Sequence, residues 1–390
     1  MISAALAKKL EEYRKAVDGA IEEAIQRYPW TVPELREAVR YSLEGGKRLR
    51  SIILLSVYRE LAGAAWATGS RHDGSGESRQ PVRRDVPETT GSDTCSDICP
   101  DICSDICSDP EPDAEALGLP DVVDSSYPVR RADSRVPATP AEPAGPANLR
   151  ECLSSAMGFA VALEMIQAYS LVHDDLPCMD DDDYRRGKPS CHKQFGEALA
   201  LLCGDALLTM AFECMLSSKN IPPERRLWAA REIAKAAGPL GMVGGQVLDL
   251  LLEGQTGASD IPGEIRSMYR MKTGALFRCS AMAGAILAGA SASVVDLCGS
   301  WGDLFGYAYQ IIDDIEDSGA GGKEQDKNTL LKTMRVSETC MEARHSLTKS
   351  IEAASAVFPG QALIKELSGM YLSRLEVLEH SEEFEHSRDR

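Results

Sequence analysis

Two clusters of aspartates, far apart in the chain, are the residues whose type and spacing suggest chemistry. The first, DDLPCMD, runs from Asp174 to Asp180 and continues through Asp183; the second, DDIED, runs from Asp313 to Asp317. Each cluster directly follows an apolar run that is predicted to be helical. On a helix, Asp313 and Asp317 share a face at i and i+4, where like charges destabilise an isolated helix. A bound cation is the natural explanation for this arrangement.

Carboxylate oxygens of this kind suit Mg²⁺, which binds few protein carboxylates and takes its other ligands from water and phosphate. Pro177 interrupts the first cluster, so Asp180 is expected to reach back from just past the end of the helix. The alternative is that both clusters are solvated acidic helix ends. Two such clusters, each directly after an apolar helix, favour the metal site.

Basic residues beside glycines form a second group of candidates. Arg binds phosphate oxygens through two parallel hydrogen bonds, whereas Lys supplies a point charge. The candidates lie in GGKRLR, after the first aspartate cluster, in KTG and near the second cluster: Lys47, Arg48, Arg50, Arg185, Arg186, Lys272, Lys323 and Lys327. A metal cluster and separate arginines suggest two anionic groups held in different ways. Surface salt bridges are the alternative for any one of these residues.

Long helices are predicted to carry these residues. Up to about residue 61, Leu6, Leu10, Tyr13 and Val17 recur at three- and four-residue steps, which indicates two or three helices. No alternating strand pattern flanked by hairpin turns is found. Further helices are expected near residues 151–175, 193–218, 223–238, 240–253, 262–290, 292–317 and 333–379. The predicted fold class is all-α, a single bundle of about ten mostly antiparallel helices around a central cavity.

Residues 62–148 have a different character, with runs such as GSRHDGSGESRQP and ATPAEPAGPAN. Such a composition buries too little apolar surface to offset its ordering entropy. The stretch is therefore predicted to be a disordered insert in one domain that spans residues 1–390. Four of its cysteines, Cys95, Cys99, Cys103 and Cys107, repeat every four residues and lack the Cys-x-x-Cys pair usual in zinc sites. The purpose of the insert is left open.

Composition excludes several classes of protein. The formal net charge of -18 argues against a nucleic-acid-binding surface, since no basic stripe is available to neutralise phosphates. No signal peptide is recognised at the start, and no run of about 18 apolar residues indicates a membrane span. The 12 cysteines are therefore interpreted as mostly reduced and buried, and the protein is expected to be cytoplasmic.

Taken together, the motifs resemble those of one enzyme family. GGKRLR, LVHDDLPCMDDDDYRRGKPSCHKQFGEA, GGQVLDL, KTG and YQIIDDIED occur in the order seen in trans-isoprenyl diphosphate synthases. The resemblance covers essentially everything outside the insert. It is strongest for the bacterial-type farnesyl and plastid-type geranylgeranyl diphosphate synthases, whose first motif carries two extra residues between its acids. It implies the isoprenoid synthase fold and a homodimer.

The resemblance also implies a reaction, in which an allylic diphosphate (dimethylallyl or geranyl) ionises with the help of Mg²⁺ and isopentenyl diphosphate attacks the cation to give farnesyl diphosphate. The implied catalytic residues are Asp174, Asp175, Asp180, Arg185, Lys272, Asp313, Asp314 and Asp317. Of these, Asp174, Asp180, Asp313 and Asp317 would hold about three Mg²⁺, with Mn²⁺ as a substitute. The implied substrate-binding residues are Lys47, Arg50, Gln167, Arg185, Arg186, Lys272, Thr273, Gln310 and Lys323.

Product length is expected to depend on Tyr169 and Ser170, just before the first aspartates. An aromatic ring at residue 169 would form the floor of the pocket and stop growth at farnesyl diphosphate, with geranylgeranyl diphosphate as the alternative product. The sequence departs from the family pattern at Gln167, where bacterial members commonly have His, and at Ser51, which replaces the usual Pro. The loop after DDIED is shorter than expected, which leaves the roles of Lys323 and Lys327 open.

Two other classes of protein share part of this pattern. A terpene cyclase also ionises a prenyl diphosphate at an Asp-rich motif, but it has no second substrate and would not need GGKRLR and Arg186. A non-catalytic partner subunit can resemble an active synthase. The two intact aspartate motifs argue against that interpretation.

Overall fold

The computed structural model describes residues 3–69, 149–252, 261–319 and 329–380, and almost all of these residues are helical. The predicted insert lies outside the described residues, except that residues 62–69 continue a helix. The predicted helix end near Leu61 was therefore wrong. The reason is local, because AGAAWATG is rich in alanine, the strongest helix former.

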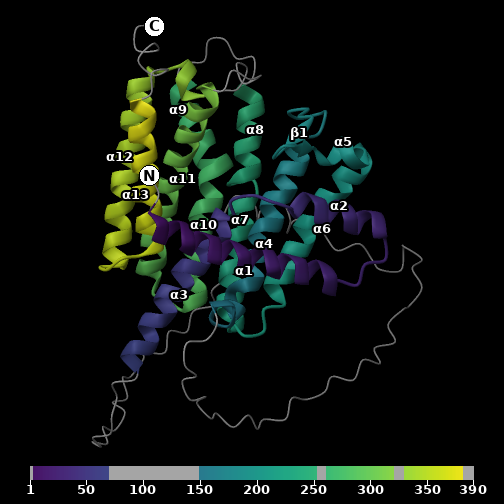
Figure 1. Ribbon diagram of the computed structural model, residues 1–390, viewed down its shortest axis with the longest axis horizontal. Coiled ribbons are helices and arrows are strands. Elements are labelled where there is room, and N and C mark those ends of the chain that lie inside the picture. The colour runs from purple at the N-terminus through teal and green to yellow at the C-terminus, as the bar shows by residue number, and fades with distance from the viewer. Residues whose placement is uncertain (1–2, 70–148, 253–260, 320–328, 381–390) are drawn as a thin grey trace, which may run out of the picture. The chain divides into compact units, whose positions relative to one another are not determined.

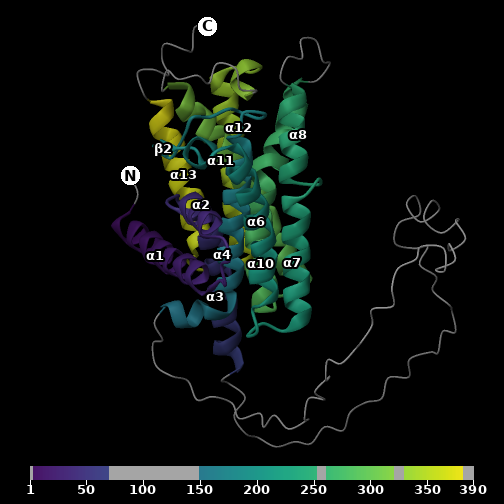
Figure 2. The ribbon, with the colours of Figure 1, turned by 90° about the vertical axis from the view of Figure 1, so that its right-hand side faces the viewer.

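Figures 1 and 2 show the arrangement of the helices. Their bounds are α1 Ala4–Arg27, α2 Pro33–Leu43, α3 Leu49–Gly69, α4 Leu149–Asp174, α5 Cys191–Phe195, α6 Glu197–Leu216, α7 Pro223–Ala237, α8 Met242–Leu252, α9 Ile261–Tyr269, α10 Ala275–Ala288, α11 Ala292–Gly319, α12 Val336–Val357 and α13 Leu363–Glu379. A π-helical turn, Arg270–Gly274, joins α9 to α10, and a 3₁₀ turn, Leu330–Lys332, precedes α12. The all-α prediction is confirmed.

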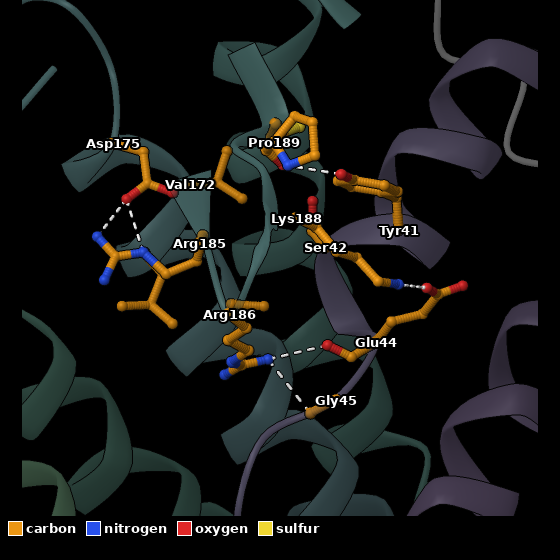
Figure 3. A pocket seen from close by; sticks show the side chains of 13 residues that line it. Tyr41, Ser42, Glu44, Gly45, Val172, Asp175, Arg185, Arg186, Lys188 and Pro189 are labelled. Atoms are coloured by element: carbon orange, nitrogen blue, oxygen red, sulfur yellow. Dashed lines mark hydrogen bonds and ion pairs between the residues drawn. The ribbon is translucent and has the colours of Figure 1, made fainter. Parts of the chain in front are cut away.

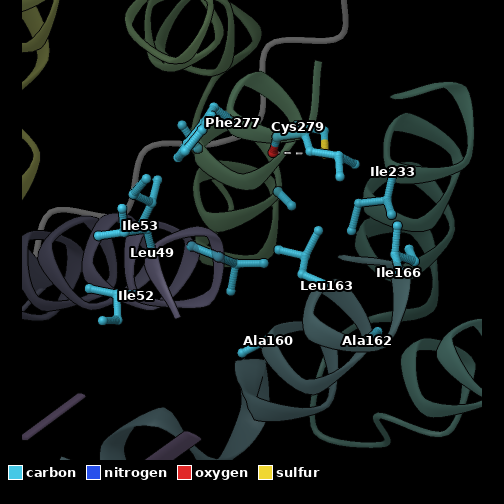
Figure 4. Packing of buried hydrophobic residues seen from close by; sticks show 14 of the residues in the cluster. Leu49, Ile52, Ile53, Ala160, Ala162, Leu163, Ile166, Ile233, Phe277 and Cys279 are labelled. Carbon is cyan, nitrogen blue, oxygen red and sulfur yellow. Dashed lines mark hydrogen bonds between the residues drawn. The ribbon is translucent and has the colours of Figure 1, made fainter. Parts of the chain in front are cut away.

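Helix α10 is the centre of the core. Nearly all of its side chains are buried, as expected for a helix that is apolar on every face. Figure 4 shows Ile53 of α3, Leu163 of α4 and Ile233 of α7 around it. Gly284 allows α3 to approach α10 closely, since a Cβ there would lie 2.5 Å from the carbonyl oxygen of Leu54. This core fixes the helices whose ends carry the aspartate clusters.

The structure corrects three details of the predicted elements. The run at 333–379 is two helices, α12 and α13, because Pro359 and Gly360 end the first of them. The run at 262–290 is interrupted by the π-helical turn. A two-stranded antiparallel hairpin, β1 Tyr184–Arg185 and β2 Lys188–Pro189, was missed altogether. Its strands are two residues long, too short to produce an alternating pattern.

Among the residues that the structure describes, two helices have the length and hydropathy of a membrane span. In the most apolar window of residues 153–174, 72% is buried inside the protein, so the hydropathy of α4 reflects a core helix. In the most apolar window of residues 197–216, only 39% is buried inside the protein. Leu201, Leu202 and Leu216 of α6 are exposed. Helix α6 therefore has an apolar outer face.

Candidate functional site

The first aspartate cluster lies at the C-terminal end of α4, where the chain folds back on itself. The backbone N–H of Asp180 donates a hydrogen bond to the carbonyl oxygen of Asp174 at 2.9 Å, and Met179 N–H donates to the carbonyl of Leu176 at 2.8 Å. Asp180 thus returns to the helix end, as predicted from Pro177. The loop brings the two predicted metal ligands of this motif next to each other.

Asp174 is held in a poorly hydrated position between two other elements. The side-chain amide of Gln246, on α8, donates to Asp174 Oδ1, and Lys272 Nζ lies 3.8 Å from Oδ2. Burial raises the pKa of Asp174 to about 6; the charge of Lys272 opposes this shift, whereas Asp180 and Asp175 add to it. The protein alone therefore compensates the charge of this carboxylate incompletely, and a bound cation would favour its ionised form.

The donor chemistry of this cluster fits Mg²⁺. Asp174 and Asp180 offer hard oxygens, while Asp175 is committed elsewhere. No group of three or more His, Cys, Asp or Glu side chains is gathered into a metal site within the described ranges. Mg²⁺ in phosphate-binding sites takes most of its ligands from water and phosphate, so few carboxylates are needed.

Arg185 is bound to acids at the base of the hairpin. Its Nε donates to Asp175 Oδ1 at 2.8 Å, and its Nη2 contacts Asp175 Oδ1 and, at 3.0 Å, Asp182 Oδ2. The carboxylate of Asp175 is buried, whereas the Arg185 side chain is about one-third exposed. Figure 3 shows this pair on one side of a pocket between α2, α4 and the hairpin. The pair fixes the hairpin to the end of α4.

The hairpin turn delivers Arg186 to the glycine pair of GGKRLR. Arg186 and Gly187 have φ values of 54° and 74°, the two left-handed residues of a type I′ turn. The guanidinium donates to the carbonyl oxygens of Glu44 at 3.0 Å and Gly45 at 3.2 Å. At Gly46, a Cβ would lie 3.0 Å from Arg186 Cζ. The glycines therefore make room for the guanidinium, which Figure 3 shows beside Gly45.

Arg50 and Arg186 are neighbouring cations, and the acid that both lie near, Glu164, is already bonded to Arg48. Lys47 Nζ lies 5.8 Å from the centre of the Tyr309 ring, and Arg50 Cζ lies 4.6 Å from the centre of the Phe277 ring. Arg50 Nε is buried with no hydrogen-bond partner among the described residues. Burial lowers the pKa of Arg50 and of Arg186, and neighbouring guanidinium groups lower that of Arg186 further. A bound anion would relieve this repulsion.

Arg48, also in GGKRLR, has a different place from its neighbours. Its side chain is buried and donates to Asp18 Oδ1 at 2.8 Å and to Glu164 Oε2 at 3.1 Å. The Ser51 hydroxyl lies 2.7 Å from the other oxygen of Glu164 and 2.7 Å from the carbonyl oxygen of Ala160, so its one hydrogen is shared between these two acceptors. Arg48 thus joins α1 to α4 inside the protein and supports the loop that carries Lys47.

The second aspartate cluster lies near the end of α11, and its second residue, Asp314, is firmly bonded. Asp314 accepts hydrogen bonds from Tyr269 Oη and, at 2.9 Å, from Gln310 Nε2. The pKa of Asp314 is raised to about 7, mainly by burial; the two hydrogen bonds oppose this rise, and the charges of Asp313 and Asp317 contribute to it. This cluster also has more negative charge than its protein partners compensate.

The π-helical turn lies between the two clusters. It packs against both α8 and α11. Lys272 Nζ donates to Asp249 Oδ2 at 2.7 Å on α8, and Thr273 Oγ1 donates to Gln310 Oε1 at 2.6 Å on α11. The turn thus connects the helix beside the first cluster with the helix that carries the second.

The remaining predicted residues lie on α4 or outside the described ranges. Gln167 is half-buried, and its backbone carbonyl oxygen accepts a hydrogen bond from Ser170 Oγ at 2.9 Å. Tyr169 is buried and meets the ring of His173 edge-on, with centroids 5.8 Å apart. Lys323 and Lys327 are not among the described residues, so their predicted roles stay predictions.

Sequence reasoning missed Gln246, Asp249 and Tyr269. The first two lie three residues apart in GGQVLDL, so they share one face of a helix that is otherwise apolar. Polar residues on an apolar helix after a glycine pair were a usable signal. Nothing in the sequence around Tyr269 indicates that its hydroxyl reaches α11.

Comparisons with known proteins agree with this geometry. A family model described as polyprenyl synthetase matches residues 145–350. The farnesyl diphosphate synthase of Bacillus subtilis is 41% identical over 214 residues, 53% of this chain and 71% of that protein. The farnesyl diphosphate synthase of Geobacillus stearothermophilus is 48% identical over 160 residues, 40% of this chain and 53% of that protein. The chloroplastic geranylgeranyl pyrophosphate synthase 11 of Arabidopsis thaliana is 44% identical over 177 residues, 45% of this chain and 49% of that protein.

The alignments with the last two relatives span about half of their length. Solved structures extend the likeness of fold over nearly the whole chain. A geranyltransferase from Legionella pneumophila superposes with a TM-score of 0.65 at 22% identity, covering 96% of this chain and 98% of that one. An FPP/GFPP synthase from Zymomonas mobilis superposes with a TM-score of 0.63 at 26% identity, and the superposition covers 95% of this chain and 99% of that one. The predicted resemblance and the predicted fold type are confirmed.

Proposed function

Because the chain belongs to the polyprenyl synthetase family, we propose that it is a trans-prenyltransferase that condenses isopentenyl diphosphate with an allylic diphosphate, dimethylallyl or geranyl, to give farnesyl diphosphate. One observation carries the proposal: the site offers two separate environments for anions. Carboxylates with raised pKa values and Lys272 form one of them. Arg50 and Arg186, with few acidic partners, form the other.

The first environment suits the diphosphate that leaves. Asp174, Asp180, Asp313 and Asp317 would hold about three Mg²⁺ ions, which stabilise negative charge on the departing pyrophosphate. Lys272 adds a fixed positive charge at the end of α4. Arg185 does the same from the hairpin, where its hydrogen bonds to Asp175 already fix its position. Groups that are positioned before the reaction need little reorganisation as charge develops.

The second environment suits the diphosphate that stays. Lys47, Arg50 and Arg186 would bind isopentenyl diphosphate beside the Gly45–Gly46 turn, with Gln167 as a further hydrogen-bond donor. The bound diphosphate would supply the anion that the buried Nε of Arg50 lacks. The two substrates would then meet near the turn that carries Thr273.

Thr273 and Gln310 would stabilise the allylic cation between the two sites. The hydrogen bond between them, at 2.6 Å, fixes their oxygens in place, and oxygen lone pairs stabilise nearby positive charge. The released pyrophosphate would take the proton lost from the new product. No protein side chain is required as general base.

Geranylgeranyl diphosphate is the second candidate product, because the relatives include synthases named for either product. Tyr169 favours the shorter product. The residue is bulky and buried, and it lies five residues before Asp174 on the same helix. An aromatic side chain at that depth would limit the length of the growing chain.

The test is to incubate the purified protein with Mg²⁺, isopentenyl diphosphate and dimethylallyl diphosphate and to identify the prenyl product by mass. We expect the fifteen-carbon diphosphate to predominate. A terpene cyclase would release a hydrocarbon or alcohol from an added prenyl diphosphate without consuming isopentenyl diphosphate. A non-catalytic subunit would give no product at all. Asp174→Ala protein, prepared in the same way, controls for a contaminating synthase.

We further propose that the protein is a homodimer, which the exposed apolar face of α6 supports, and that it acts in the cytoplasm. Leu201 and Leu202 are 47% and 56% exposed, and a second copy of the chain would cover them. The mass in solution, measured by light scattering, should be twice that of the chain. Leu201→Lys with Leu202→Lys should give monomers, whereas a dimer in this variant would place the interface elsewhere.

A further inference from the structure

Asp249 is the nearest acid to the Lys272 ammonium. The distance from Lys272 Nζ is 2.7 Å to Asp249 Oδ2 and 3.8 Å to Asp174 Oδ2. Both side chains of the close pair are largely buried, with exposures of 24% and 20%. A charged hydrogen bond in such a place is stronger and more directional than one on the surface.

The backbone fixes this contact from the side of α8. A Cβ at Gly245, one turn before Asp249, would lie 2.2 Å from the backbone nitrogen of Lys272. A Cβ at Gly244 would lie 2.7 Å from Met271 Cε. The glycine pair therefore lets α8 pack directly against the π-helical turn. The position of Asp249 relative to Lys272 depends on backbone contact as well as on side-chain attraction.

The π-helical turn fixes the contact from the other side. Thr273, the next residue after Lys272 in this turn, donates a hydrogen bond to Gln310 on α11. The turn is therefore bonded to α11 through Thr273 and to α8 through Lys272. The Lys272 side chain extends toward α8 and the end of α4. Burial lowers the pKa of the Lys272 amine, and the charges of Asp174 and Asp249 more than reverse this effect.

The two acids differ in their distance from Lys272 and in their other partners. Asp174 lies farther from the ammonium and shares its other oxygen with Gln246. Asp174 is also assigned here as a metal ligand, so its charge is divided between several partners. Asp249 makes the shorter contact with Lys272 and lies one helix away from the aspartate cluster.

We propose that Asp249 is a positioning residue that holds the Lys272 ammonium at the end of α4, where it meets the diphosphate of the allylic substrate. This inference rests on the proposed function. It predicts that binding of the allylic diphosphate depends on Asp249, whereas binding of isopentenyl diphosphate does not.

The experiment compares Asp249→Asn, Asp249→Glu, Lys272→Met and the Asp249→Asn/Lys272→Met double variant. Glu352→Gln is the matched control, because Glu352 forms an exposed ion pair with Lys349 at 2.9 Å. The readouts are kcat, the KM for each substrate, and the affinity for inorganic pyrophosphate by calorimetry, with and without Mg²⁺. Thermal melting identifies variants that lose the fold.

We expect Asp249→Asn to weaken pyrophosphate affinity and to raise the KM for the allylic substrate about tenfold, with the KM for isopentenyl diphosphate nearly unchanged. The double variant should be no worse than Lys272→Met, and Asp249→Glu should recover part of the loss. Equal changes in both KM values, or additive losses in the double variant, would overturn the inference. Failure of the proposed function is distinguishable: the parent protein would then make no prenyl product, whatever its affinity for pyrophosphate.

Discussion

Lys272 and Thr273 are consecutive residues whose side chains form hydrogen bonds on opposite sides of one π-helical turn. Lys272 contacts Asp249 of α8 and lies 3.8 Å from Asp174, whereas Thr273 contacts Gln310, whose amide donates to Asp314. A π-helical turn inserts an extra residue into a helix and changes the direction of the side chains that follow. The turn therefore links the surroundings of both aspartate clusters within two residues.

Removal of one acid from either cluster should abolish turnover. We expect Asp174→Ala and Asp313→Ala each to lower kcat at least about a thousandfold, since each loses charge stabilisation where the leaving group forms. Circular dichroism should show an unchanged helical content. Activity within tenfold of the parent at saturating Mg²⁺ would contradict the assignment of these residues.

The stability of the metal-free protein should fall as pH rises from about 5 to 8. The pKa values of Asp174 and Asp314, about 6 and about 7, lie above the ordinary value of 3.8. A carboxyl group with a raised pKa contributes stability that is full below about pH 4 and is lost as pH rises through its folded-state pKa. Thermal melts in chelator should therefore show a lower Tm at pH 8 than at pH 5.5.

Mg²⁺ should reverse this loss, because a bound cation compensates the ionised carboxylates. Its effect on Tm should be larger at pH 8 than at pH 5.5. The Asp174→Asn/Asp314→Asn variant provides the control, and its Tm should depend less on both pH and Mg²⁺. A parent protein with the same Tm at both pH values, with and without Mg²⁺, would show that these two groups do not control stability.

The network of Arg48, Glu164 and Ser51 should matter for stability. Arg48→Met leaves the buried carboxylate of Glu164 without its cation, which costs about 3–5 kcal/mol in comparable buried pairs. Ser51→Ala removes one hydrogen bond to the same carboxylate and should cost about 1–2 kcal/mol. Urea unfolding measures both changes.

Ser355→Ala is the control for this network, since Ser355 is exposed and its one hydrogen bond within the described part of the chain is to the carbonyl of Ile351 in α12. Its free energy of unfolding should stay within about 0.5 kcal/mol of the parent. If Ser51→Ala behaves like the control, Glu164 does not depend on Ser51.

The sequence was sufficient to predict the helices and the aspartate clusters because both depend on local pattern. Apolar periodicity predicted the helices of the first 61 residues, and Pro177 predicted the return of Asp180 to Asp174. The hairpin was missed because its conformation depends on two residues, Arg186 and Gly187, with positive φ.

Contacts between distant segments were harder to predict. GGKRLR does not reveal that Arg48 is buried against Glu164, which lies 116 positions away, while Arg50 lacks such a bond at Nε. Likewise, the sequence does not reveal that Lys272 meets Asp249, because the meeting depends on the packing of α8 against the π-helical turn. Local spacing predicts which residues share a helix face, but only tertiary packing determines what that face contacts.

The last prediction concerns the length of the product. Tyr169 lies five residues before Asp174 on α4, which is about 7.5 Å along the axis at 1.5 Å per residue. With the allylic diphosphate bound at the aspartates, its tail would extend along α4 toward the N-terminal end of the helix. We expect Tyr169→Ala to open space for one more five-carbon unit, so that the main product changes from farnesyl to geranylgeranyl diphosphate.

Tyr169→Phe is the matched control, because it keeps the ring that meets His173 and removes only the hydroxyl. Its product should remain farnesyl diphosphate if ring volume determines the length. All three proteins must be compared at the same ratio of substrates, since excess isopentenyl diphosphate alone lengthens the chain. The ring of Tyr169 is buried, so the alanine variant also leaves a cavity in the core, and its Tm must be measured alongside its products. A folded, active Tyr169→Ala protein that still makes farnesyl diphosphate would show that another residue forms the floor of the pocket.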